Sequence, residues 1–223
     1  KMWKLSLPEL AAAAARAPYD EKPIVDRAPD FSETQTLGYP KNHARVHGLE
    51  LSKLFGESKT GVALVSVNSP QLEYRPKDGF RQLAQVTDLA AHIKIAPKQS
   101  LVWVTRLSSG APVVQADVQL LDATGAVKWS GQTDAQGLAD VPGAVALQLA
   151  TKGYDWEYPF ALVTAAKDGD FGFTANTWTS GVEPYEFGLT QGWEAQRPQP
   201  AGYVFSDRGI YRPGDTVHLK GVA

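Results

Sequence analysis

The sequence predicts an all-β protein made of antiparallel β-sandwich domains, with one short helix near its start. Between residues 89 and 162, stretches that alternate apolar and polar side chains recur at a spacing of roughly ten residues. Turns rich in glycine and aspartate separate these stretches. The sequence has no cysteine, so neither a disulfide nor a Cys-ligated metal can hold the fold together. Short strands joined by such turns are typical of an antiparallel sandwich.

The composition excludes several classes of function. The chain has 223 residues, enough for one or two domains, and its 43% hydrophobic and 21% charged residues are ordinary for a soluble protein. Its net charge of −2 gives no footprint for nucleic-acid binding. No apolar run reaches about 18 residues, so we predict no direct membrane span. Residues 1–17 do not form a signal peptide, because Pro8 and Glu9 interrupt them; an export signal would lie upstream.

The first element predicted is a helix over residues 7–17. Ser6 can cap it, Pro8 suits an early helical position, and Glu9 complements the helix dipole. The alanines at 11–15 then propagate the helix.

The second region predicted is an antiparallel pair of strands, residues 49–55 and 61–67, joined by a loop. The polar, proline-punctuated stretch at 20–47 before this pair is interpreted mainly as loop. The charged stretch at 73–79 after it contains proline and an Asp-Gly pair, so it indicates a domain boundary.

The third region carries the sandwich. Its predicted strands are 89–95, 101–107, 114–120, 127–129, 145–149 and 156–162. Its predicted turns include 122–125, 134–137 and 168–169, where aspartate bonds forward and glycine accepts a positive φ. Beyond it, 190–202 is interpreted as a linker, and a strand pair begins at Tyr203. The Pro213-Gly214 pair predicts a type II turn within that strand pair.

Residues that could carry chemistry are few. His43 and His47 lack a carboxylate at ligand spacing, and Asp168-Gly-Asp170 is a hairpin turn more readily than a calcium loop. Glu183 and Glu186 are the paired carboxylates of the chain, in a predicted loop without a sign of burial. No nucleophile elbow, phosphate-binding loop or zinc-protease motif occurs. We therefore expect no catalytic, cofactor-binding or metal-binding residue, and no enzyme.

The chain has six tryptophans, which raise the question of a sugar-binding surface. Trp103, Trp129 and Trp156 fall within strand patterns and are predicted to lie in the core. Trp178 and Trp193 fall in predicted loops and are the candidates for a surface contact.

A resemblance to a known family rests on the stretch from Ser206 to Val217. It resembles the opening of a macroglobulin domain in the α2-macroglobulin superfamily, whose pattern is approximately Thr-Asp-Lys/Arg-x-Ile/Leu-Tyr-Lys/Arg-Pro-Gly. Ser206 replaces the Thr, and the matching positions are Asp207, Arg208, Ile210, Tyr211, Arg212, Pro213 and Gly214. A second stretch, from Val86 to Gly137, resembles the preceding domain of bacterial α2-macroglobulins. In the family, the motif builds a turn and the start of a strand.

The resemblance implies tandem macroglobulin-like domains. The implied division is a helical leader and linker at 1–19, the closing part of one domain at 20–76, a complete domain at 77–189, a linker at 190–202 and the first strands of a truncated domain at 203–223. Large members of the family are secreted or periplasmic, often lipid-anchored in bacteria. They trap proteases after a bait region is cut, and many also hold a thioester that requires cysteine. This chain has no cysteine.

The implied role is therefore a non-catalytic scaffold without cofactors, in contact with neighbouring macroglobulin domains. Target proteases would be met by parts of the protein outside this chain, and a lipidated N-terminus absent from it would provide an anchor to the inner membrane. The alternative is a free-standing Ig-like or transthyretin-like module for adhesion or carbohydrate binding. The Tyr-Arg-Pro-Gly stretch favours the macroglobulin interpretation, because those modules lack it.

Overall fold

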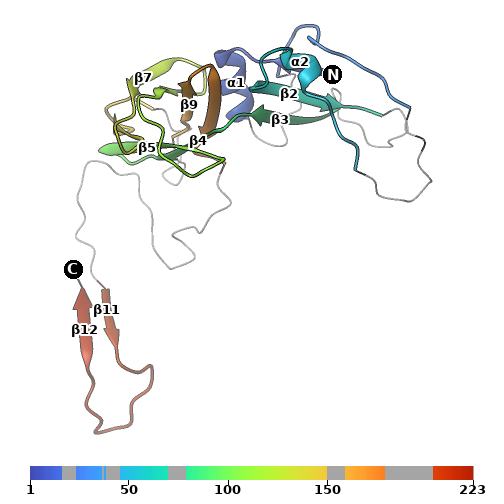
Figure 1. Cartoon of the computed structure of the whole chain (residues 1–223). Helices are drawn as coiled ribbons and strands as arrows, with labels where there is room; N and C mark the ends of the chain where they lie inside the picture. The colour runs from blue at the N-terminus through green and yellow to red at the C-terminus, as the bar shows by residue number, and fades with distance from the viewer. Residues whose placement is uncertain are drawn as a thin grey trace. The chain divides into compact units, whose positions relative to one another are not determined.

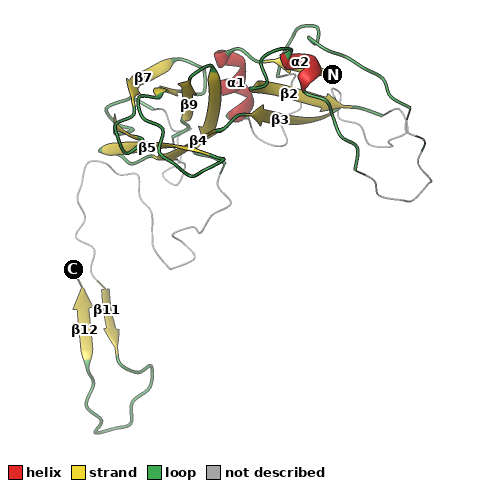
Figure 2. Cartoon of the chain, viewed as in Figure 1, coloured by secondary structure: helices red, strands yellow, loops and turns green. Residues whose placement is uncertain are grey.

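The computed structural model describes residues 1–16, 24–36, 38, 46–69, 79–149, 159–178 and 203–222. The chain divides into two compact units, residues 1–193 and 194–223, and each is described by itself. Strands dominate the described residues, with two short helices among them (Figure 2).

The first unit begins with a three-stranded antiparallel sheet in the order β1-β2-β3. Its strands are β1 (Met2–Lys4), β2 (Gly61–Val67) and β3 (Phe80–Val86). β2 and β3 pair along all seven residues of each strand, and Figure 1 shows them side by side. The boundary predicted between residues 76 and 77 therefore falls between two strands of one sheet.

Helix α1 (Leu7–Ala14) starts where the sequence predicts it, at a capping box. The Ser6 N–H and the Ser6 hydroxyl both donate to Glu9 Oε2, at 2.8 and 2.9 Å. Leu10, Ala11 and Ala14 are buried against residues from β2, β6, β9 and β10. In Figure 1, α1 lies between the β2–β3 sheet and the strands of the sandwich. The helix is thus part of the core of the unit, which differs from the leader expected from the sequence.

The strand predicted at 49–55 is wrong, because this segment forms the short helix α2 (Ser52–Phe55). The Phe55 N–H donates to the Leu51 carbonyl oxygen at 3.1 Å, and Gly56, with φ of 64°, ends the helix. Leu51, Leu54 and Phe55 recur at the i, i+3, i+4 spacing of a helix and pack against the β1–β2 sheet. β2, with which this segment was expected to pair, pairs instead with β1 on one side and β3 on the other.

The sandwich predicted from the strand pattern is confirmed. One antiparallel sheet has the order β4-β5-β8 and the other the order β10-β9-β6-β7. The strands are β4 (Leu89–Lys94), β5 (Gln99–Arg106), β6 (Asp117–Leu121), β7 (Val127–Gln132), β8 (Leu138–Pro142), β9 (Leu162–Lys167) and β10 (Asp170–Ala175). Between the sheets, Val102 and Val104 from β5 pack with Val118 and Leu120 from β6 and with Val163 from β9, all buried.

The turns also follow the sequence. The Gly125 N–H donates to the Asp122 carbonyl oxygen, and the Gly137 N–H to that of Asp134, both at 3.0 Å. Asp168 and Gly169 both have positive φ, 52° and 79°, and they join β9 to β10 as a hairpin. The hairpin interpretation of this segment is confirmed.

Several strand predictions within the sandwich need correction. Residues 145–149 form a turn, in which the Leu147 N–H donates to Gly143 and the Leu149 N–H to Ala144. Leu147 and Leu149 are buried there without strand pairing. The alternation of apolar and polar residues in this segment therefore reflects burial and not a strand. β6 starts later than predicted, since Gln115 has a φ of 53° that interrupts a strand. In the strand predicted at 156–162, residues 156–158 lie outside the described residues, and β9 begins only at its end.

The second unit contains an antiparallel hairpin of β11 (Tyr203–Ser206) and β12 (Leu219–Val222). Tyr203 pairs with Val222 and Ser206 with Leu219. The strand pair expected around the proline-glycine turn is confirmed, and its second strand starts at Leu219.

Candidate functional site

The family motif in the second unit forms a compact, internally bonded connection between β11 and β12. The Tyr211 hydroxyl donates to Asp207 Oδ1, and the Arg208 N–H donates to the Tyr211 hydroxyl at 3.1 Å. The Arg208 guanidinium lies 3.7 Å from Asp215 Oδ2 and over the Tyr211 ring. The hydrogen bond from Tyr211 lowers the pKa of Asp207, with a further contribution from the His218 N–H. These polar side chains hold the connection in shape.

The predicted proline-glycine turn lies within this connection. The Asp215 N–H donates to the Arg212 carbonyl oxygen at 3.0 Å, which closes a four-residue turn with Pro213 and Gly214 at its centre. Gly214 has a φ of 93°, the conformation for which a type II turn requires glycine. Ile210, the apolar member of the motif, is 86% exposed among the described residues. The described contacts of the motif are those of a folded turn.

The tryptophans are distributed differently from the prediction. Trp103, expected in the core, is 43% exposed on the outer face of β5, where its indole N–H donates to the Gln136 carbonyl oxygen at 3.1 Å. Val102 and Val104 take the core positions instead. Both faces of β5 carry apolar residues, so the alternation in the sequence does not indicate which face is buried. His92 is exposed beside Trp103 with a ring separation of 5.4 Å.

Of the other tryptophans, Trp129 packs against the core as predicted and Trp156 lies outside the described residues. Trp178, a candidate for a surface contact, is 45% exposed, with its ring edge-on to Phe173 at 5.0 Å. The second candidate, Trp193, lies outside the described residues.

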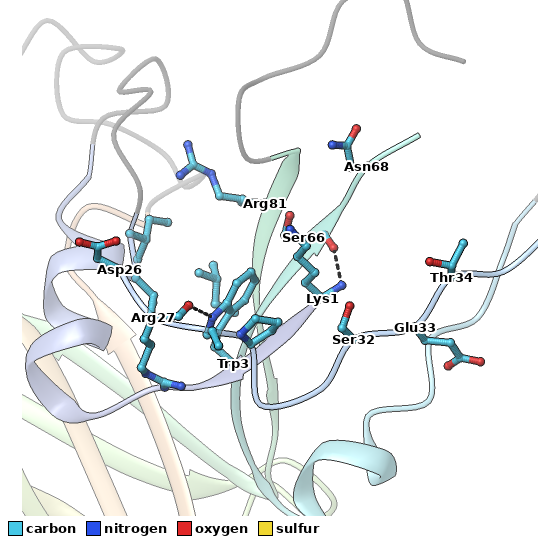
Figure 3. A pocket seen from close by; sticks show the side chains of 15 residues that line it. Lys1, Trp3, Asp26, Arg27, Ser32, Glu33, Thr34, Ser66, Asn68 and Arg81 are labelled. Atoms are coloured by element: carbon cyan, nitrogen blue, oxygen red, sulfur yellow. Dashed lines mark hydrogen bonds between the residues drawn. The ribbon is translucent and has the colours of Figure 1, made fainter. Parts of the chain in front are cut away.

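A hollow of about 620 Å³ lies beside β1, between β2 and the segments around residues 24–34 (Figure 3). The Trp3 ring lines it, with the indole N–H bonded to the Arg27 carbonyl oxygen at 3.1 Å. Arg81 from β3 and Ser66 from β2 border it on other sides. The sequence carried no signal for this site, since its walls come from four separated segments and no motif connects them.

Arg27, which lines this hollow, is neutralised by two nearby carboxylates. Arg27 contacts Glu9 at 3.2 Å and Asp30 at 2.9 Å, and Asp30 also accepts the Lys4 N–H at 2.7 Å. The Lys4 N–H and then Arg27 lower the pKa of Asp30, and Asp30 and then Glu9 raise the pKa of Arg27. These two carboxylates anchor Arg27 beside β1 and the start of α1, so neither is positioned as a general acid or base.

Metal ligands do not gather in the described part of the chain. Within it, no group of three or more His, Cys, Asp or Glu side chains could hold a metal ion. His43, Glu183 and Glu186 lie outside the described residues, and His47 contacts Gln35. None of the helices described is both long enough and apolar enough to cross a membrane.

Comparison with known proteins connects this geometry to one family. The model of the bacterial alpha-2-macroglobulin MG3 domain matches residues 86–194, which include every strand of the sandwich. An alpha-2-macroglobulin homolog of a Nostoc species is 30% identical over 183 residues, covering 74% of this chain. The homolog of Yersinia pestis is 28% identical over 145 residues, covering 63% of this chain. The chain spans only 9% and 7% of the lengths of these relatives.

A solved structure supports the fold. The crystal structure of native alpha-2-macroglobulin from Escherichia coli spanning domains MG0-NIE-MG1 matches with a TM-score of 0.53 and 18% identity. The match covers 78% of this chain and 53% of that chain. The resemblance stated from the sequence motifs is confirmed by the family model and the curated relatives.

Proposed function

Because this chain belongs to the bacterial α2-macroglobulin family, we propose that it is a scaffold segment of an α2-macroglobulin-type protease inhibitor and is not itself catalytic. One observation carries the proposal. The MG3 family match begins at residue 86, at the end of β3, and runs past the last strand of the sandwich. A sandwich matched as one domain of a much longer family member supports a role as one part of a larger assembly.

The proposed activity of the whole protein is protease trapping. In the family that the chain resembles, a protease cuts a bait region and is then enclosed by the inhibitor. This chain has no cysteine and so cannot supply the thioester that many members use. Target proteases would therefore act on other regions, while this segment contacts neighbouring macroglobulin domains. We place the protein in the periplasm or cell envelope, with a lipidated N-terminal anchor, as the resemblance implies.

The polar residues of the described sandwich fit this role. Asp122 accepts hydrogen bonds from Thr124 and Ala126 within a turn, and Asp134 does the same for Gln136 and Leu138. Burial alone would raise the pKa of Asp122, but the hydrogen bonds from Thr124, Ala126 and Lys128 together outweigh it and the pKa is lowered. A carboxylate held ionised inside a turn, as Asp122 is, stabilises the backbone and is poorly suited to accept a proton during catalysis.

The test uses the whole inhibitor protein that contains this chain. It is incubated with proteases of different specificity, and their hydrolysis of a large protein substrate is compared with that of a small peptide. Trapping predicts that the large substrate is protected while the small one is still cut. Equal inhibition of both substrates, or of neither, would contradict trapping.

The role of this segment needs a matched pair of variants in the whole protein. Leu120→Ala removes a side chain fully buried between the sheets, whereas Leu107→Ala removes one that is 63% exposed. We expect the first to weaken protection of the large substrate after mild heating and the second to leave it unchanged. The isolated 223-residue chain should neither inhibit nor hydrolyse; measurable hydrolysis by it would refute the scaffold role.

The alternative, a carbohydrate-binding module, draws on the exposure of Trp103 and Trp178. Retardation of the isolated chain in polysaccharide gels, lost in Trp103→Ala and Trp178→Ala, would favour it over the scaffold proposal.

A further inference from the structure

β10 is the outer strand of its sheet, and a side chain from another sheet bonds to its open edge. The Phe173 N–H donates to Gln85 Oε1 at 3.1 Å, and Gln85 Nε2 donates to the Phe173 carbonyl oxygen at 3.2 Å. Phe173 lies opposite Thr164 in the neighbouring strand β9. In an antiparallel pair, alternate residues point both backbone groups away from the partner strand. The bonds to Gln85 show that Phe173 is such a residue.

The same alternation directs the backbone groups of Phe171 and Ala175 outward. The Phe171 N–H donates to Asp170 Oδ1 at 2.8 Å, and the Ala175 carbonyl oxygen accepts the Trp178 N–H at 3.0 Å. Along the described edge, local contacts thus satisfy the Phe171 N–H and the Ala175 carbonyl oxygen, and Gln85 satisfies both outward groups of Phe173 between them.

We propose that the Gln85 amide acts as a surrogate strand, which closes the β10 edge to strand addition by a second copy of this chain. An amide side chain presents one donor and one acceptor, as a peptide group does, so it fits the two outward groups of Phe173. An unprotected edge is a template for pairing with another chain. Two identical antiparallel edges are self-complementary about a two-fold axis, so a second β10 is the occupant that fits the opened edge.

The origin of Gln85 makes this closure conditional. Gln85 belongs to β3, in the three-stranded sheet, whereas β10 belongs to the sandwich. The Asp88 N–H, just after β3, donates to Asp170 Oδ2 at 2.8 Å and gives the junction a second attachment to β10. The edge stays closed only while the three-stranded sheet keeps its place against β10, so a shift of that sheet opens it.

The test compares glutamine variants in the full 223-residue chain. Gln85→Ala removes the surrogate strand, and because Gln85 is exposed the change leaves no core cavity. Gln82→Ala is the matched control on the same strand, since among the described residues the Gln82 amide donates to the adjacent Leu83 carbonyl oxygen and makes no bond to β10. We expect hydrogen exchange at the Phe173 amide to quicken by about 5–30-fold in Gln85→Ala, and sedimentation velocity to show concentration-dependent dimers. Gln82→Ala should match the parent chain in both measurements.

Gln85→Glu provides a second measure. It keeps the acceptor for the Phe173 N–H but loses the donor to the carbonyl oxygen, so Phe173 exchange should lie between those of the parent chain and Gln85→Ala. Unchanged exchange at Phe173 in Gln85→Ala would overturn the proposal, as would faster exchange without self-association at any protein concentration tested.

Discussion

Replacing Leu10 with alanine tests whether helix α1 belongs to the core of the first unit. Leu10 is 1% exposed and packs in one cluster with Leu121, Leu162 and Phe173. The change removes roughly three methylene equivalents at about 0.8 kcal/mol each, which gives about 2.4 kcal/mol of lost transfer free energy. The cavity left behind brings the expected loss of unfolding free energy to about 3–5 kcal/mol.

The assay is urea unfolding followed by tryptophan fluorescence. With a denaturant slope of about 2 kcal/mol per molar urea, the unfolding midpoint of Leu10→Ala should fall by about 1.5–2.5 M. Leu107→Ala is the control, since Leu107 is 63% exposed and its truncation should change stability by less than about 0.5 kcal/mol. A Leu10→Ala midpoint equal to that of the control would refute the packing argument and restore the helix as an independent leader.

Two further predictions concern a close approach and a titrating carboxylate. A Cβ on Gly172 would lie 2.7 Å from the Leu89 carbonyl oxygen, whereas one on Gly48 would meet nothing within 4 Å. Gly172→Ala should therefore lower the unfolding free energy by about 1–3 kcal/mol and Gly48→Ala should not, as measured by urea unfolding; equal effects would contradict the close approach. Burial alone would raise the pKa of Glu9, but hydrogen bonds from Ser6 and Arg27 outweigh it and the pKa is lowered. Glu9 therefore contributes stability above about pH 4.3 that is lost as pH falls through its folded-state pKa. Glu9→Gln should flatten the loss of unfolding free energy in this acid range, and a pH profile unchanged by the substitution would count against the ion pair.

Where adjacent residues determine the backbone, prediction from sequence succeeded. The helix start at Ser6, the Asp168-Gly169 hairpin and the turn at Gly214 all formed where predicted. Each depends on one side chain reaching its own backbone or on one residue accepting a positive φ. The strand spacing similarly predicted the sandwich, since its turns recur at regular intervals.

Prediction failed where the outcome depends on residues that are distant in sequence. The segment 49–55 has apolar residues that fit a strand or a helix, and the arrival of β1 and β3 beside β2 left it no strand to pair with. Trp103 and Val102 are neighbours on β5 and point to opposite faces of it, and the face that carries Val102 packs against β6. The hollow beside Trp3 and the Gln85 contact with Phe173 join residues far apart in the chain, so no local pattern could indicate them.

The sequence by itself thus determined the all-β class, the turn geometry and the motifs that belong to the α2-macroglobulin family. Tertiary structure alone decided that α1 is a core element, which face of β5 is buried and how the edge of β10 is closed. The physical reason is the range of the interactions. Turn and cap preferences act over a few residues, whereas burial and edge pairing are set by whichever surface the rest of the chain brings into contact.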